Sequence, residues 1–548
     1  MTNKPNEVIV IGSGATGGMA ALTLAKAGIK VLVIEAGPQL SAKEAFGSEP
    51  FNSYRRLFGL IKGSYKKQAQ HPGFWKSNPL LYSNEKESIY SHPKDKPFIW
   101  TQGNQVGGKS LTWGGITLRL SDYDFKAARK DGFAPEWPIE YSDLSDHYTF
   151  IEKLIEIYGS KDNLDYLPDG NYIGEFPFTE IEEYFAEKVK INLGLKVIHS
   201  RGFGPNINSY NNKWPKFSSP GSTLGLAIKT GKVEILTEHI AERLIMNSSR
   251  EKAKGIVIVN KKNGKRRFLK SNLIVLCAST IQSIRFLLDS EDNNQENGFI
   301  DPSGNLGCYL MDHISTCRFF SIPNTPSTSP NNSKQVLSGA GSFFIPFGNK
   351  SSNYKEHNFI RGYGIWGGID RFEPPDFLKF KPKTKTGFLI GHGEVLPKKE
   401  NKVTLSKKTD IWGIKTPHID CQWGENEKKM VEHINKTIKE IVNSSGGEIL
   451  PLNKIIKLPF LDNIINKTLA TQKAAPPPGY YIHEVGGARM GSSENESVLN
   501  KWNQLWNCKN VLVVDGSCWP TSSWQSPTLT LMAITRRACL NVIKPSAE

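Results

Sequence analysis

The sequence predicts an α/β protein, α+β overall, in which a domain built from alternating strands and helices is interleaved with a second domain built on an antiparallel sheet. Three observations predict it. The chain opens with a strand, a glycine-rich turn, a helix and a second strand, while strand-like segments dominate residues 320–400. A strand and a long helix then return near the C-terminal end. At 548 residues the chain also exceeds the usual size of one hydrophobic core, so two domains are expected.

The opening segment has the order strand, turn, helix, strand. Residues 7–12, EVIVIG, form an apolar run typical of a buried strand. Helical spacing then predicts a helix over 19–28 that ends at Gly28, and KVLVIEAG at 30–37 indicates a second strand. These elements predict a βαβ unit.

A glycine pattern lies between the first strand and the helix. Gly12, Gly14 and Gly17 follow the G-x-G-x-x-G spacing, and Glu35 ends the next strand. Glycine permits the tight turn and a close approach to a pyrophosphate, the helix N-terminus supplies N–H donors, and the carboxylate can accept ribose hydroxyls. The pattern predicts a dinucleotide site, and by itself it leaves NAD and FAD as alternatives.

The middle of the chain is less regular. Residues 38–100 are polar, aromatic and weakly periodic, which favours a surface excursion or a lid. Residues 231–278 contain three strand-like segments, and Asn263-Gly264 is typical of a hairpin turn between the last two. Residues 320–400 favour an antiparallel sheet with long loops, which we expect to wall the substrate pocket.

The C-terminal segment completes the first domain. Residues 510–517 indicate a strand that enters a turn, and 528–543 have helical spacing. The predicted division assigns 1–45, 97–135, 220–313 and 484–548 to the nucleotide-binding domain, 136–219 and 314–483 to the substrate-binding domain, and 46–96 to the excursion or lid.

Composition limits the kind of protein. No apolar run is long enough to cross a bilayer, and the first residues show no export signal, so a cytoplasmic protein is expected. The seven cysteines form no C-x-x-C pair and are expected to be reduced, and no metal site is predicted. The formal charge of +16 is spread along the chain in short clusters, which disfavours nucleic-acid binding and leaves peripheral contact with an anionic membrane open.

Two further glycine-containing clusters suit a flat cofactor. GNQVGGKSLTWGG at 103–115 lacks the side chains that would keep a ring system from the backbone, although a plain surface loop has the same composition. In 513–534 a strand leads into Asp515-Gly516, and Pro527 precedes a helix whose N-terminus is suited to a cofactor oxygen.

These clusters, in this order, resemble the glucose-methanol-choline (GMC) family of FAD-dependent oxidoreductases. The resemblance covers nearly the whole chain and is closest to the sugar and polyol branch that includes pyranose oxidases. It also rests on LSDYDFKAARKDGFAPEWPIEYSDLSDHY, CASTIQSIRFLL, GCYLMDH, LPKKENKVTLSKKTDIWGI and HEVGGARMG. The fold it implies is an FAD-binding Rossmann-like domain with an interleaved substrate-binding domain.

The resemblance implies which residues bind FAD. The implied contacts are Gly12, Ser13, Gly14, Thr16, Gly17, Glu35 and Ala36 for the ADP part; Gly107, Gly108, Ser110, Thr112, Trp113, Gly114 and Gly115 along the flavin; Ala241 at the adenine; and Asp515, Gly516, Pro527 and Thr528 over the pyrophosphate and ring.

His483, in YYIHEVGGARMG, occupies the position of the family's active-site histidine. The resemblance implies that it takes the proton of an alcohol while hydride passes to flavin N5. Imidazole titrates near neutral pH and suits that task. The alternative is a histidine that only stabilises the turn, and His313 and His392 are expected to have mainly structural roles.

Two positions depart from the pattern of the family. Pyranose oxidases attach FAD through a histidine at the place that Thr112 occupies here, so noncovalent FAD is expected. The second catalytic residue, Asn or His in the family, is replaced by Ser526, with Gln525 beside it. A hydroxyl offers fewer simultaneous hydrogen bonds than an amide, so either Ser526 or Gln525 is a candidate partner of His483.

The prediction is therefore an FAD-dependent oxidoreductase that acts on a CH–OH group of a sugar, a polyol or another hydroxylated ring. Its electron acceptor is either oxygen or a separate carrier, and its oligomeric state is not predicted. The alternatives are a flavin enzyme of the same fold with non-redox chemistry, such as a lyase or photodecarboxylase, and a flavin-loaded binding protein.

Overall fold

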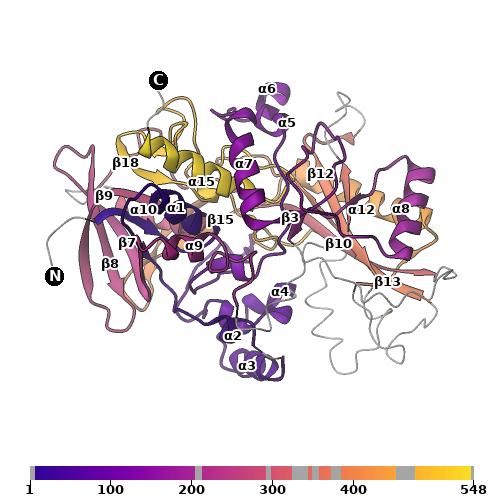
Figure 1. Ribbon diagram of the computed structural model, residues 1–548, viewed down its shortest axis with the longest axis horizontal. Helices are drawn as coiled ribbons and strands as arrows, with labels where there is room; N and C mark the ends of the chain where they lie inside the picture. Colours follow the sequence, from indigo (N-terminus) through magenta and orange to yellow (C-terminus); the bar gives the residue numbers. More distant parts are fainter. Residues whose placement is uncertain are drawn as a thin grey trace.

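The computed structural model describes residues 6–47, 49–203, 213–291, 298–323, 343–347, 357–371, 384–451, 454 and 475–544. Parts of the expected sheet at 320–400 therefore lie outside the described residues. Two large sheets lie side by side along the long axis of the molecule (Figure 1).

The first sheet has eight strands, in the order β17-β18-β9-β1-β2-β6, with β8 pairing β9 and β7 pairing β8. The pairs β2-β6, β1-β2, β1-β9 and β9-β18 are parallel, so segments from both ends of the chain share one sheet. Its strands are β1 (Asn6–Ile11), β2 (Val31–Ile34), β6 (Val233–Leu236), β7 (His239–Met246), β8 (Ala253–Asn260), β9 (Arg266–Leu276), β17 (Gln504–Leu505) and β18 (Cys508–Val513).

Strand β1 is buried on both faces because its alternate residues enter two different cores. Ile9 and Ile11 join one cluster of buried side chains, whereas Val8 and Val10 join another. Each fully buried side chain of this size stabilises the fold by roughly 1.5–3 kcal/mol. Double burial explains why the strand is a continuous apolar run without alternation.

The helices of the first domain surround this sheet. Helix α1 (Ala15–Lys26) packs between α9 (Thr223–Lys229) and α15 (Thr528–Ile543), and α15 also packs on α7 (Ser142–Ile155). Helix α10 (Thr280–Ser290) follows β9 and packs on β7. The ends of α1, α10 and α15 thus lie near the carboxyl ends of parallel strands, where α/β sheets bind ligands.

The second sheet is antiparallel, with the order β16-β10-β13-β12-β11-β4. Helix α12 (Glu425–Ser444) packs on β10 and β13 and contacts α8 (Glu180–Leu193). The strands are β4 (Ile198–His199), β10 (Ile314–Pro323), β11 (Phe343–Phe347), β12 (Tyr363–Ile369), β13 (Thr384–Gly393) and β16 (Glu448–Ile449). Two small ribbons pair β3 (Ile157–Tyr158) with β5 (Gly202–Phe203) and β14 (Lys402–Thr409) with β15 (Lys415–Asp420).

Several elements differ from the sequence expectations. Helix α1 begins at Ala15, four residues before the predicted start, because the glycine-rich turn itself passes into the helix. Strand β2 is shorter than 30–37, and β7 was not predicted because its polar residues obscure the apolar pattern. The Asn263-Gly264 hairpin is confirmed between β8 and β9, with Gly264 at a φ of 68°.

The excursion at 46–96 is helical where the sequence indicated irregular structure. It contains α3 (Glu49–Ile61), α4 (Pro72–Lys76) and two short 3₁₀ turns at Gln68–Gln70 and Pro79–Leu81. Helix α3 lies at the lower edge of the view, away from both sheets (Figure 1). The other short helices are α2 (Ala42–Ala45), α5 (Asp122–Phe125) and α6 (Ala127–Asp131).

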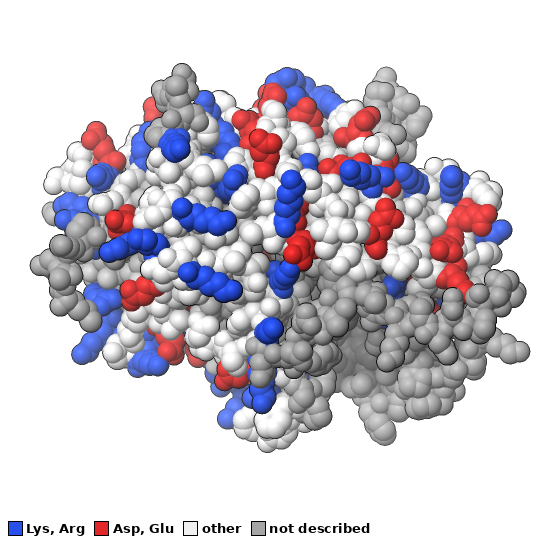
Figure 2. All heavy atoms as spheres, in the orientation of Figure 1, with Lys and Arg blue, Asp and Glu red and all other residues white. Residues whose placement is uncertain are grey.

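Charge is distributed evenly over the face that Figure 2 shows. Lysine and arginine side chains are scattered among acidic ones and form no continuous stripe there. Among the described residues, no helix combines the length and the apolar character that a membrane crossing requires.

Candidate active site

A cavity of about 1150 Å³ is lined by both sheets and by the excursion. The first sheet and its turns contribute the glycine-rich segments, while β10, β12 and β13 contribute Thr316, Trp366 and Phe388. Residues between His71 and Ile89 also line it. A site of this size that is shared between two domains suits a large cofactor together with a small substrate.

Three helices begin at the cavity wall. The lining includes Gly14 before α1, Ser279 before α10 and Pro527 before α15. The first N–H groups of a helix lack partners within the helix and carry partial positive charge, so each of these ends favours an anionic or carbonyl oxygen. The arrangement fits a dinucleotide with a pyrophosphate and a polar ring.

The glycines of the first turn have different structural tasks. A Cβ at Gly12 would collide with the Cys277 carbonyl, and one at Gly17 would collide with the Gly12 carbonyl. A Cβ at Gly14 would meet only the Gly107 carbonyl oxygen, at 3.9 Å, and Gly14 lines the cavity. Gly12 and Gly17 therefore permit internal packing, while Gly14 leaves room for a ligand against the backbone.

Ser13 connects the first two glycine clusters to Glu35. Its hydroxyl donates to the Glu35 carboxylate at 2.5 Å and accepts the Gly107 N–H at 2.9 Å. Burial raises the pKa of Glu35, although bonds from Ser13 and the Gly37 N–H oppose that effect. The carboxylate is thus fixed at the cavity wall, in the position where a ribose acceptor is needed.

The loop that carries His483 is held by one buried carboxylate. Asp312 accepts backbone N–H bonds from Gly479 at 2.8 Å, Tyr481 at 3.2 Å and His483 at 2.9 Å. Burial, and then the nearby Glu484, raises the pKa of Asp312 to about 7. Ile482 has a φ of 66°, a conformation that a β-branched residue adopts only when its surroundings impose it.

A chain of hydrogen bonds determines which nitrogen of His483 carries a proton. The Nε2–H of His313 donates to the Ser523 carbonyl, because a carbonyl can only accept. Nδ1 of a neutral His313 is then an acceptor, and it lies 2.9 Å from Nδ1 of His483. Nδ1 of His483 therefore carries the proton, and its Nε2 retains a lone pair.

Both histidines are neutral near pH 7. Burial lowers the pKa of His313 to about 4. Burial is also the largest cause that lowers the pKa of His483 well below its usual value, followed by His313, His392 and Lys109. The site therefore holds two unprotonated imidazoles at physiological pH.

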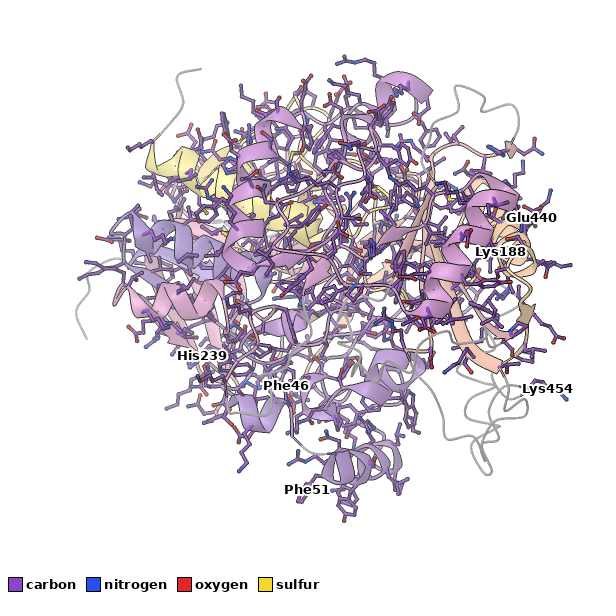
Figure 3. The ribbon with its side chains drawn as sticks, turned by 45° about the vertical axis from the view of Figure 1, so that its right-hand side comes forward. Phe46, Phe51, Lys188, His239, Glu440 and Lys454 are labelled. Carbon is purple, nitrogen blue, oxygen red and sulfur yellow. The ribbon has the colours of Figure 1, made fainter. Side chains whose placement is uncertain are left out.

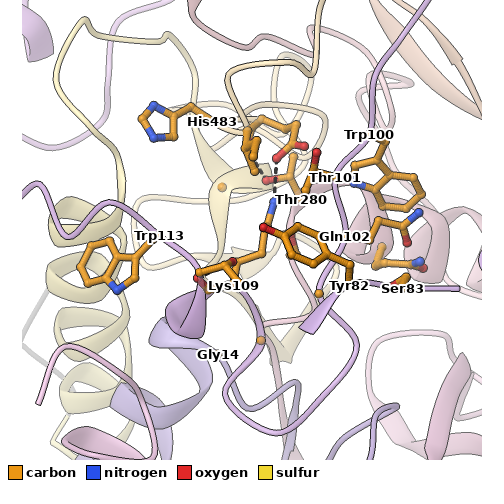
Figure 4. Close-up of a pocket in the computed structure, with 18 of the residues that line it drawn as sticks. Gly14, Tyr82, Ser83, Trp100, Thr101, Gln102, Lys109, Trp113, Thr280 and His483 are labelled. Atoms are coloured by element: carbon orange, nitrogen blue, oxygen red, sulfur yellow. Dashed lines mark hydrogen bonds and ion pairs between the residues drawn. The ribbon is translucent and has the colours of Figure 1, made fainter. Parts of the chain in front are cut away.

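An ion pair lies next to His483, at Glu484. The Lys109 ammonium contacts the Glu484 carboxylate at 2.9 Å, and the Thr280 hydroxyl donates to the Glu484 backbone carbonyl at 2.5 Å (Figure 4). Lys109 belongs to the second glycine cluster and Thr280 begins α10, so these contacts tie the His483 loop to the first domain.

Most of the predicted site residues line the cavity. They are Gly12, Ser13, Gly14, Thr16, Glu35, Ala36, Gly108, Ser110, Thr112, Trp113, Gly114, Gly115, Ala241, His483, Asp515, Gly516, Ser526, Pro527 and Thr528. Gly17 and Gly107 are not among the residues that line the cavity, and both pack against other parts of the protein, so their contact with the cofactor stays a prediction.

Gln525, which the sequence offered as a candidate partner of His483, does not line the cavity. Its side chain is fully buried outside the cavity lining, and its amide nitrogen donates to Asp124 at 2.8 Å. Adjacent residues of this turn point in different directions, so Ser526 faces the cavity and Gln525 faces away from it. Of the two candidate partners of His483, the geometry retains Ser526.

Sequence reasoning missed the residues that position His483. Asp312 and His313 stand next to each other in the GCYLMDH segment, where the sequence indicated a mainly structural role for His313 and none for Asp312. The contact of His313 with His483 adds to the structural role expected for it. A buried acid directly before a histidine was the available signal, but nothing in the sequence indicated that these two residues would meet a loop 170 positions away.

The fold and the cavity together define a dinucleotide-dependent oxidoreductase, because a cofactor against the first sheet and a substrate against the second would meet at a neutral base. The chain belongs to the GMC oxidoreductase family, whose N-terminal model matches residues 6–315 and whose C-terminal model matches residues 397–535. It is thus an FAD-dependent oxidoreductase that acts on CH–OH groups. The family membership supports neither of the alternatives, the flavin enzyme with non-redox chemistry or the flavin-loaded binding protein.

Individual relatives are distant in sequence and similar in length. The chain is 25% identical to 2-methyl-1,2-propanediol dehydrogenase of Mycolicibacterium austroafricanum, with 97% of this chain and 94% of the relative covered. It is 21% identical to the fructose dehydrogenase large subunit of Gluconobacter japonicus, with 97% and 96% covered. Among solved structures, formate oxidase has the same fold, with a TM-score of 0.66, 14% identity and 99% of each chain covered.

Proposed function

We propose that this protein oxidises a CH–OH group of a sugar, a polyol or another hydroxylated small molecule, with His483 as the base. The observation that carries the proposal is the hydrogen-bond chain Ser523–His313–His483, which leaves the lone pair of His483 on Nε2. An alcohol becomes a hydride donor as its hydroxyl proton leaves, so an unprotonated base at the cavity wall is the group that the reaction requires.

The residues of the chain would act on protons and orientation. His483 would accept the hydroxyl proton at Nε2 and keep its Nδ1–H bond to His313, which disperses the charge that forms on the imidazole. Asp312 would hold the loop so that the ring cannot turn away. Bound FAD supplies the hydride acceptor, as flavins do in this class of reaction.

Ser526 is the proposed partner of His483 for the substrate hydroxyl. It lines the cavity directly before α15, whereas Gln525 is occupied by Asp124. A serine hydroxyl donates one hydrogen bond and accepts others, so it can orient an alcohol oxygen without competing for its proton. The diol and fructose dehydrogenases named above support small hydroxylated substrates.

FAD is proposed to bind without a covalent link. Thr112 lines the cavity at the place where pyranose oxidases carry the linking histidine, and its hydroxyl donates to the Lys109 carbonyl. A threonine hydroxyl forms no histidyl bond. The proposed location is cytoplasmic, and the proposed electron acceptor is oxygen or a separate carrier.

The base assignment is tested by three variants of the holoenzyme. His483→Ala should slow anaerobic reduction of the flavin by substrate by about 10² to 10⁴-fold, measured by stopped-flow bleaching of flavin absorbance. His313→Leu, which removes the acceptor of the Nδ1–H, should lower kcat about tenfold or more with little change in KM, because fewer molecules hold the productive tautomer. His313→Gln, which offers an acceptor oxygen, is the matched control and should recover part of the loss.

Flavin content and melting temperature should stay close to wild type in all three variants, so that a loss of rate reports on the base. Unchanged flavin reduction in His483→Ala would exclude the proposed mechanism. Equal rates in His313→Leu and wild type would remove the tautomer argument and leave the base assignment to be judged on His483→Ala alone.

A further inference from the structure

Helix α3 presents an apolar face to solvent. Phe51, Tyr54, Leu57, Phe58 and Ile61 have relative exposures between 47% and 74%. Their spacing of three and four residues places them along one side of the helix. Figure 3 shows Phe51 at the outer end of the molecule, directed away from the body. We name these five residues the α3 face.

The opposite side of α3 is polar and holds the helix to the protein. Asn52 donates to the Gly47 carbonyl at 3.0 Å, and Arg56 donates to the carbonyls of Phe74 at 3.1 Å and Ser77 at 2.8 Å. Asn52 and Arg56 are each only 4% exposed. The helix therefore reverses the usual arrangement, in which apolar residues face the core. Its docking is specific, so the exposure of the α3 face does not come from a loosely attached helix.

Cations lie at the α3 face. Residues 50–67 contain five lysine and arginine residues and no aspartate or glutamate, although Arg56 is buried on the opposite side of the helix and Glu44 lies near Arg55. The Arg55 guanidinium lies 5.2 Å from the ring centre of Phe51, and the Lys62 ammonium lies 4.2 Å from that of Phe58. Each cation thus lies over the face of an aromatic ring of the α3 face, so apolar and positively charged groups occupy the same exposed surface, as in helices that lie at a membrane interface.

We infer that the α3 face docks this protein onto a lipid bilayer with anionic headgroups. A protruding helix with aromatic and aliphatic residues on its outer side and cations next to its aromatic rings has the two features that such binding needs, namely apolar insertion and attraction to negative lipids. A second copy of the chain fits less well, because two α3 faces in contact would bring Arg55 and Lys62 of both copies close to one another.

Docking in this way would orient the cavity. Arg56 binds the backbone at Phe74 and Ser77, and Gly73 and Ser77 line the cavity. The cavity wall formed by Gly73 and Ser77 therefore contacts the inner side of α3, and the α3 face lies on the outer side of the same helix. Membrane docking would place that wall next to the bilayer, whereas the sheets would lie further from it.

The test measures binding of the holoenzyme to vesicles. Co-sedimentation with vesicles of phosphatidylcholine and phosphatidylglycerol in equal parts should retain the protein, and vesicles of phosphatidylcholine alone should retain about tenfold less. The double variant Leu57→Ser and Phe58→Ser should abolish binding, and the double variant Arg55→Glu and Lys62→Glu should weaken it about tenfold or more. High salt should weaken wild-type binding because it screens the headgroup charge.

The matched control is Ile191→Ser on α8, where an isoleucine with 67% exposure stands far from α3 in sequence. This variant should bind vesicles as wild type does. In Tyr54→Trp, tryptophan emission should shift to shorter wavelength with anionic vesicles and not with phosphatidylcholine. Activity on a water-soluble substrate should be unchanged in all α3 variants, so a failure of docking is distinct from a failure of the proposed chemistry.

Three results would overturn the inference: no binding to anionic vesicles, equal binding by wild type and the Leu57→Ser and Phe58→Ser variant, or self-association in sedimentation velocity that this variant removes while vesicle binding stays unchanged. The last result would assign the α3 face to contact between copies of the chain.

Discussion

At the scale of single residues, the position of His483 depends on two neighbouring residues, Asp312 and His313. Asp312 holds the backbone of the His483 loop and His313 holds its ring, and both directly precede strand β10. The position of His483, the proposed base, is therefore set by the start of a strand inside a sheet, although His483 itself belongs to an irregular loop. Sites supported in this way lose little freedom when substrate binds.

The first prediction at this scale concerns pH. A base acts only while it is unprotonated, and burial keeps the pKa of His483 well below 6.5. As pH falls, His483 therefore stays unprotonated until that lowered pKa is reached, so the acid limb of kcat/KM should lie well below pH 6.5. The measurement is kcat/KM of the holoenzyme between about pH 5 and 8.

Asp312 also titrates in this range, since burial raises its pKa to about 7. It accepts N–H bonds in either protonation state, so it should add no limb of its own. Asp312→Asn removes the titrating group, but it leaves an acceptor for only one side of the loop, because Oδ1 binds the His483 N–H and Oδ2 binds those of Gly479 and Tyr481. This variant should therefore lower kcat by loosening the loop, while its acid limb should lie where that of wild type lies. An acid limb at or above pH 6.5 in both proteins would contradict the neutral, buried base.

At the scale of elements, the turn between β1 and α1 separates packing from ligand contact. Gly17 lies against the Gly12 carbonyl inside the protein, whereas Gly14 faces the cavity. Glycine is thus needed at Gly17 for internal packing and at Gly14 for ligand contact, and the spacing of the glycines in the sequence does not distinguish these two reasons.

This separation predicts different effects of the same substitution. Gly17→Ala should lower the free energy of unfolding by roughly 1–3 kcal/mol, because α1 must move away from the turn. Gly14→Ala should change the stability of the flavin-free protein by less than about 0.5 kcal/mol and lower its affinity for FAD. Urea unfolding of the flavin-free proteins and FAD titration measure the two effects. Similar losses of stability in both variants would show that Gly14 also packs internally.

The sequence predicted those elements whose pattern is local. The βαβ opening, the Asn263-Gly264 hairpin and helix 528–543 follow from apolar periodicity and turn residues, and the structure contains them. Strand β7 was not predicted because three of its eight side chains, those of His239, Glu242 and Arg243, are polar or charged and interrupt the apolar pattern. The choice between Gln525 and Ser526 could not be made either, since the direction of a side chain in an irregular turn depends on the packing around it.

The contact of His313 with His483 could not be predicted from the sequence for another reason. Two segments 170 residues apart meet only because β10 belongs to the second sheet and the His483 loop returns to the first domain. The resemblance indicated by position that His483 is the histidine of the site. Only the structure shows its hydrogen-bond partner, His313, and therefore its tautomer.

At the scale of the whole molecule, the cavity joins both sheets. Removing the ligand that fills it should cost stability across the entire fold. A ligand at 100 times its dissociation constant stabilises a protein by about 2.7 kcal/mol, so FAD should raise the melting temperature of the flavin-free protein by several degrees.

Riboflavin at the same concentration is the control. It lacks the ADP part that the α1 N-terminus and Glu35 are placed to bind, so it should give a smaller shift. Acid precipitation of the holoenzyme should leave the yellow colour in the supernatant, as expected for flavin without a bond at Thr112. Yellow colour in the washed pellet would show a covalent link at another residue.

The order of strands in the first sheet also bears on how the holoprotein is made. Strand β9 pairs with β1 on one side and with β18 on the other, and α15 supplies part of the cavity wall. Both β18 and α15 lie within the last 41 residues of the chain, from Cys508 onward. A nascent chain on the ribosome therefore has the glycine turn long before it has a closed pocket, and a complete flavin site must wait until β18 and α15 have been synthesised.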